Sequence, residues 1–121
     1  MKIRIQRNSV RFRLSKSDID QLTRTGFLKE ETAFGHANFG YAITRSNDHN
    51  ELSATFEDGT ILLIMPENQI NGWAENDIVG FNAVMEINNT ESLKLLVEKD
   101  FKCLDNVTED QSDHYENPKI C

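Results

Sequence analysis

The sequence contains little cysteine. Of its 121 residues only two are cysteines, Cys103 and Cys121. Small secreted domains that depend on disulfides carry several pairs of cysteines, so two thiols near one end of the chain do not form a disulfide framework. We therefore expect both thiols to be reduced and the protein to be cytoplasmic.

Long apolar runs and an excess of positive charge are also missing. No stretch approaches the roughly 20 apolar residues that cross a bilayer, and the first residues alternate charged with aliphatic side chains, unlike a signal peptide. The formal net charge is −7 at pH 7, whereas general nucleic-acid binders carry positive charge that neutralises phosphates. We therefore expect neither a membrane nor a nucleic-acid partner.

The usual motifs of catalysis and cofactor binding are absent as well. The chain has no phosphate-binding loop, no dinucleotide glycine fingerprint, no paired-cysteine zinc motif, no HExxH and no GxSxG. Cys103, His114 and Cys121 are zinc-ligand types, but their spacing matches no usual zinc site, so we predict no metal and no cofactor. No histidine stands beside Cys103 in sequence to activate it as a nucleophile.

What the sequence does contain is enough apolar residues for a core. A chain of this length is one domain by size and buries about two-thirds of its unfolded surface. Apolar periodicity disappears from Cys103 onward. We predict a single domain over 1–104 followed by an acidic tail over 105–121. No internal repeat is evident.

Alternation of apolar and polar residues predicts about eight short strands. Two alternating runs flank Arg7 and Asn8, which predicts an N-terminal hairpin. Another hairpin turns at Asp58 and Gly59, and the apolar run 61–65 that follows predicts a central strand. The other strands are predicted near 27–34, 39–44, 79–87 and 93–97.

One helix is predicted at about 16–25 by signals at both of its ends. Ser15 is a favourable N-cap, and Asp18 three residues later completes a capping box. At the other end Gly26 can adopt the left-handed conformation that ends a helix, and Phe27 stands where a Schellman motif places an apolar residue.

Pro66 favours the start of a second, short helix at about 67–74, with Ile70 and Trp73 in the core and Gly72 weakening it. Mostly hairpin-length connections with few helices predict an α+β fold on a largely antiparallel sheet. A sheet of about eight short strands could curl into a partly open barrel, which would also protect its edges.

Positive charge gathers at the start of the chain. Arg4, Arg11 and Arg13 should project from one face of two neighbouring strands, where guanidinium groups could bind phosphate or carboxylate. Glu98 and Asp100 could add carboxylates to that face. A barrel lined in this way would resemble the triphosphate-tunnel metalloenzymes, but those begin with alternating glutamates, and this chain begins with basic residues.

Negative charge gathers at the other end of the chain. Five carboxylates stand in the predicted tail, those of Asp105, Glu109, Asp110, Asp113 and Glu116. The simplest interpretation is that the basic residues form a solvated sheet face and that the acidic tail packs on the basic N-terminal hairpin.

Several segments resemble a family of small, uncharacterised bacterial proteins. They are Met1–Ile5, Asn8–Leu14, Trp73–Phe81, Val97–Leu104 and Glu109–Asp113. The likeness spans most of the chain. It implies a bacterial cytoplasmic protein and supplies neither an activity nor an active site.

Two functions remain open on these grounds. The favoured one is a non-catalytic binding or accessory protein, with a protein partner or a small anionic ligand. The alternative is an enzyme or binder that acts on an anionic, phosphorylated small molecule through the arginine-lined face. An enzyme needs a pocket, so the alternative requires Arg4, Arg11 and Arg13 to line a concavity with Glu98 or Asp100.

Overall fold

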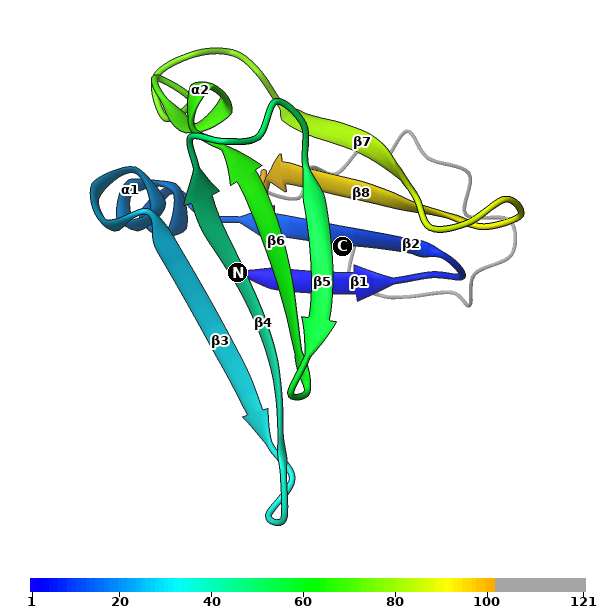
Figure 1. The fold of residues 1–121 in the computed structure, drawn as a ribbon. Helices are drawn as coiled ribbons and strands as arrows, with labels where there is room; N and C mark the ends of the chain where they lie inside the picture. The colour runs from blue at the N-terminus through cyan, green and yellow to red at the C-terminus, as the bar shows by residue number, and fades with distance from the viewer. Residues whose placement is uncertain (102–121) are drawn as a thin grey trace, which may run out of the picture.

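Residues 1–101 form four β-hairpins and two helices (Figure 1). The computed structural model describes residues 1–101, so the predicted tail and the domain boundary at residue 104 lie outside the described residues. The predicted α+β class with about eight strands is confirmed. In order, the elements are β1 (Lys2–Ile5), β2 (Ser9–Leu14), α1 (Lys16–Thr25), β3 (Phe27–Ala33), β4 (Asn38–Ser46), β5 (Ser53–Glu57), β6 (Thr60–Pro66), α2 (Glu67–Ile70), β7 (Gly80–Glu86) and β8 (Ser92–Lys99).

Each of the two sheets consists of two hairpins. Sheet A has the order β1-β2-β8-β7, and sheet B has the order β3-β4-β6-β5. Strands within a hairpin are antiparallel, whereas the central pairs β2·β8 and β4·β6 are parallel. The prediction of a largely antiparallel arrangement is confirmed, and β6 is a central strand as its apolar run indicates.

The barrel that the number of strands suggested does not form. Within residues 1–101, both sheets end in unpaired edge strands, and no strand of one sheet pairs with a strand of the other. The reason is that α1 and the connection through α2 carry the chain from one sheet to the other, so each hairpin pairs only within its own sheet. The strands of sheet B cross over those of sheet A (Figure 1), which is an orthogonal sheet packing.

The order of elements repeats, which corrects the expectation of no internal repeat. Residues 2–46 form hairpin, helix and hairpin, and residues 53–99 do the same. Arg7 and Asp58, 51 residues apart, both have a φ of 52° in the first turn of each half. The same separation relates pairs of buried residues: Val10 and Ile61, Phe12 and Leu63, Leu14 and Met65, Ile19 and Ile70, and Leu22 and Trp73. Each sheet therefore takes one hairpin from each half.

Helix α1 begins with the predicted capping box. Ser15 Oγ accepts a hydrogen bond from the Asp18 backbone N–H at 3.2 Å, and Asp18 Oδ2 accepts one from the Ser15 backbone N–H at 2.9 Å. The Met1 ammonium lies 2.8 Å from the same Asp18 oxygen. Burial raises the pKa of Asp18, but the bonds from Met1 and Ser15 outweigh burial, so the pKa lies below its usual value. The carboxylate is therefore held in its charged form.

The other end of α1 is closed by Gly26, as predicted. Gly26 has a φ of 77°, and its N–H donates to the Leu22 carbonyl at 2.8 Å. This single bond is the αL motif rather than the expected Schellman motif. The difference arises because the Phe27 N–H donates instead to Thr25 Oγ1, at 3.3 Å.

Helix α2 is shorter than the predicted span of 67–74. It ends at Ile70, because Gly72 has a φ of 77°, which an α-helix does not accommodate. Trp73 nevertheless lies in the core as predicted, with no exposed surface. Its indole N–H donates to the Ile78 carbonyl at 2.8 Å, so the polar end of the buried ring is satisfied.

The core lies between the inner faces of the two sheets, and both helices lie at one corner of the sheet pair (Figure 1). Inward-facing side chains come from both sheets, with Ile19 and Leu22 added by α1. Neither helix in residues 1–101 has the length and apolar character of a membrane-spanning segment.

We expect both caps of α1 to contribute to stability. Ser15→Ala should lower the free energy of unfolding by about 1 kcal/mol, because a helix N–H loses its partner. Gly26→Val should lower the free energy of unfolding further. The valine would have to adopt an unfavourable positive φ, and its Cβ would meet the Arg45 guanidinium at 3.1 Å. Urea unfolding followed by circular dichroism measures both. Ser17→Ala, at an exposed position within the first turn, is the control, and equal stability of all variants would show that the caps are unimportant.

Candidate functional site

The register of sheet A places the predicted arginines on one face. Arg4 stands opposite Arg11 in the β1·β2 hairpin, and Arg13 stands beside Glu98 in the parallel β2·β8 pair. Alternate residues of β2 are buried in the core, so these arginines lie on the outer face of sheet A. Asp100 follows directly after β8.

Ion pairs connect most of this group. Glu98 Oε1 lies 3.4 Å from Arg11 Nε and 3.3 Å from Arg13 Nε, so one carboxylate oxygen serves two guanidinium groups. Asp100 Oδ2 lies 3.0 Å from Lys2 Nζ. Arg4 forms no ion pair with any residue of 1–101.

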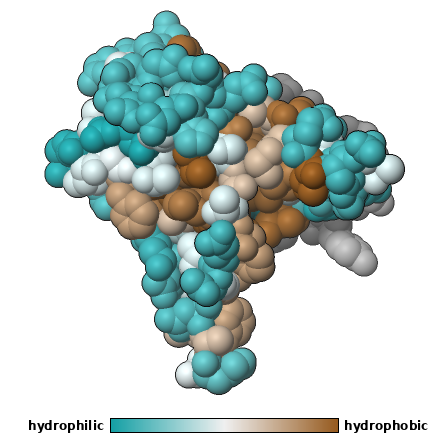
Figure 2. All heavy atoms as spheres, viewed as in Figure 1, coloured by the Kyte–Doolittle hydropathy of each residue, from teal (hydrophilic) through white to brown (hydrophobic). Residues whose placement is uncertain are grey.

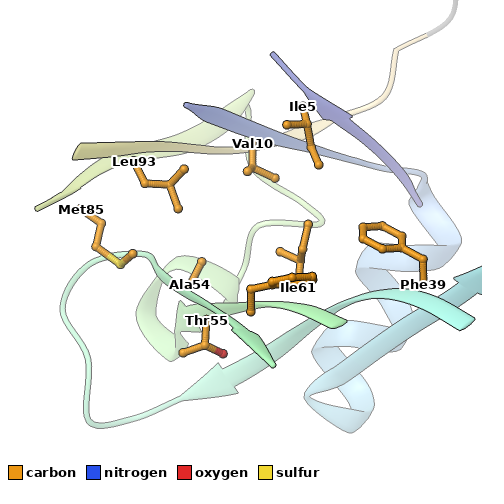
Figure 3. Close-up of a pocket in the computed structure, with 9 residues that line it drawn as sticks. Ile5, Val10, Phe39, Ala54, Thr55, Ile61, Met85 and Leu93 are labelled. Atoms are coloured by element: carbon orange, nitrogen blue, oxygen red, sulfur yellow. The ribbon is translucent and has the colours of Figure 1, made fainter. Parts of the chain in front are cut away.

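An apolar hollow lies elsewhere in residues 1–101, between the two sheets. It has a volume of about 440 Å³ and is formed where strands of both sheets begin or end away from the helices (Figure 3). Figure 2 shows apolar atoms gathered where the sheets meet, with polar atoms on either side. Sheet A contributes Ile5, Val10, Met85 and Leu93, and sheet B contributes Phe39, Ala54, Thr55, Phe56 and Ile61. We call this hollow the inter-sheet cleft.

The inter-sheet cleft is apolar and open to solvent. Phe56 is 65% exposed and Ile5 is 55% exposed, one from each sheet. The rings of Phe39 and Phe56 lie 6.4 Å apart between centroids, tilted by 43°. Among the nine lining residues the Thr55 hydroxyl is the one polar side-chain group, and none has a titratable side chain. Concentrated, exposed apolar surface of this kind is typical of an interaction site.

Both halves of the chain contribute equivalent residues to the cleft. Ile5 and Phe56 are 51 residues apart, as are Val10 and Ile61, and all four line it. The cleft therefore lies where the two halves meet. None of Arg4, Arg11, Arg13, Glu98 or Asp100 lines it.

A model of a family of unknown function, DUF7009, matches residues 1–119. The chain belongs to this family. The resemblance to a family without an assigned activity is thereby confirmed. Comparisons with curated proteins and with solved structures found no match.

Sequence reasoning missed the inter-sheet cleft. Its strand residues alternate as core residues do, and alternation alone does not distinguish a covered position from an open one. The exposed aromatic Phe56, next to the Asp58 turn, is a signal that could have indicated it.

No metal site is formed within the described part of the chain. Residues 1–101 contain no group of three or more His, Cys, Asp or Glu side chains that could hold an ion. Cys103, His114 and Cys121, which the sequence offered as zinc-ligand types, lie outside the described residues.

We expect Glu98 to stabilise the basic face. Glu98→Gln should lower the free energy of unfolding by about 1 kcal/mol at low salt, because Arg11 and Arg13 lose the carboxylate that separates their charges. The loss should shrink at high salt, where exposed charges are screened. Denaturant unfolding at two salt concentrations measures it. Glu86→Gln, on the same face without an ion pair in residues 1–101, is the control, and equal effects of the two would contradict the assignment.

Proposed function

We propose that the protein is a non-catalytic binding protein that holds a small apolar ligand in the inter-sheet cleft. The observation that carries the proposal is the apolar lining from both sheets around about 440 Å³. Small-molecule sites in proteins are concave, mostly apolar and typically about 300–1,000 Å³ in volume. The ligand class that fits is an uncharged molecule with an alkyl chain or a hydrocarbon ring.

The chemistry of the lining favours binding over catalysis. General acid–base and nucleophilic catalysis need a titratable or nucleophilic side chain within reach of the substrate. The nine lining residues include no titratable group, and their one hydroxyl, that of Thr55, points away from the cleft (Figure 3). A ligand in this cleft would therefore be recognised by shape and apolar contact.

Ligand binding would also remove exposed apolar surface from water. Fully burying a side chain such as Phe or Ile contributes about 1.5–3 kcal/mol. Phe56 and Ile5 are each more than half exposed, so covering both contributes about as much as fully burying one such side chain. A micromolar dissociation constant, about 8 kcal/mol, is consistent with these terms.

The anionic-ligand function has weaker support. The arginines do gather on one face, but that face lies outside the inter-sheet cleft.

A bacterial cytoplasmic location is part of our proposal, and it rests on the two cysteines and on the family resemblance.

An uncharged fluorescent probe tests the proposal without involving the arginines. N-phenyl-1-naphthylamine should gain fluorescence on the wild-type protein with a micromolar dissociation constant. Ala54→Phe should weaken probe binding at least tenfold, because the added ring occupies the cleft that Ala54 lines. Phe56→Ala should weaken it less, since only one wall is removed.

Val84→Phe is the matched control. Val84 is 56% exposed and lies on the outer face of sheet A. The substitution Val84→Phe therefore adds the same ring outside the cleft. Circular dichroism verifies that each variant is folded. Absence of probe binding to the wild type, or equal binding to Ala54→Phe and Val84→Phe, would contradict the proposal.

A further inference from the structure

The outer face of sheet A carries like charges directly opposite one another. In the β1·β2 hairpin, Lys2 faces Arg13 and Arg4 faces Arg11. Like charges opposite each other on neighbouring strands destabilise a sheet. Two of the four cross-strand pairs of this hairpin are therefore unfavourable by themselves. We call Lys2, Arg4, Arg11 and Arg13 the basic face.

The fold itself does not require this charge. The second half of the chain builds the same hairpin, β5·β6, in sheet B. Its positions equivalent to the basic face, 51 residues further along the chain, are Ser53, Thr55, Leu62 and Ile64. All four are uncharged, so the same backbone arrangement forms without basic residues. The basic face is therefore a feature of the first half alone and not a requirement of the hairpin.

The described residues neutralise the basic face only in part. Glu98 is shared between Arg11 and Arg13, and Asp100 pairs with Lys2. Two carboxylates therefore stand against four basic side chains. Arg4 has no acidic partner within residues 1–101.

The chain leaves the described structure beside this face. The Asp100 backbone N–H donates to the Leu14 carbonyl at 2.9 Å, at the end of β2, and its side chain pairs with Lys2 at the start of β1. Residues 101–104 span up to about 14 Å when extended, and neighbouring strands lie about 4.8 Å apart. The next carboxylate, that of Asp105, is thus within reach of the whole basic face.

We propose that the acidic segment 105–121 docks on the basic face of sheet A. The segment contains five carboxylates and one basic residue, Lys119, so its charge complements the face. A tethered segment has an effective concentration near the millimolar range, which free anions have to exceed. Single exposed ion pairs are weak, so the contact depends on several pairs together and weakens with salt.

Paramagnetic relaxation in the 121-residue protein tests the docking. Ser112→Cys, with Cys103→Ser and Cys121→Ser, provides one thiol in the centre of the acidic segment for a nitroxide label. At low salt the label should broaden the amide signals of β1 and β2 strongly and leave those of the turn near Gly35 unchanged. High salt should restore the broadened signals at least twofold.

Charge variants identify the interaction. Replacing the five acids by their amides should abolish the broadening, and Arg4→Gln with Arg11→Gln should reduce it at least twofold. Arg24→Gln, on α1 away from the basic face, is the control and should leave it unchanged. Inorganic tripolyphosphate should also release the segment, as an anion competing for the same face.

Three outcomes would overturn the docking. They are no broadening of β1 and β2 at low salt, broadening that persists when the five acids are amides, and broadening of the inter-sheet cleft instead of the basic face. Circular dichroism of each labelled variant ensures that broadening is compared between folded proteins.

Discussion

The crossing of two twisted sheets over one shared core is the constraint on which the rest of the structure depends. Twisted sheets that cross orthogonally pack closely over part of their area and separate toward open corners. One corner is closed by α1 and α2, which follow the buried ends of β2 and β6. The inter-sheet cleft lies at the opposite ends of these strands, where Val10 and Ile61 are the second residues of β2 and β6. The cleft is therefore a consequence of the architecture, and its apolar lining is the basis of the binding function that we propose.

The repeated order of elements shows which features belong to the fold and which belong to this chain. Buried positions such as Phe12 and Leu63 have the same role in both halves, as do the two positive-φ turns. The outer faces of the two hairpins differ, because the four basic positions of β1·β2 are uncharged at the equivalent positions of β5·β6. Side chains that the backbone does not demand are the ones to examine for function, because functions are carried by sites on a fold.

Local signals in the sequence predicted local structure well. Ser15 and Gly26 fix both ends of α1 through hydrogen bonds to residues within a few positions. The residues that determine these caps therefore stand close together in the sequence. Whether the strands close into a barrel depends on which distant hairpins pair, and alternation does not reveal that pairing. The partly open barrel suggested by the number of strands therefore does not form. Gly72 ends α2 early because it adopts a positive φ. From the sequence, Gly72 was expected only to weaken this helix. Predicting the cleft would have required knowing which apolar residues, such as Phe56, remain exposed in the fold.

Binding of apolar molecules in the inter-sheet cleft is tested most directly by a methyl NMR titration of the 121-residue protein with 1-decanol. We expect saturable shifts of the methyl signals of Ile5, Val10, Ile61 and Leu93, which line the cleft, and no shift of Val84 on the outer face of sheet A. Shifts that do not saturate, or shifts of Val84 without those of the four cleft residues, would contradict it.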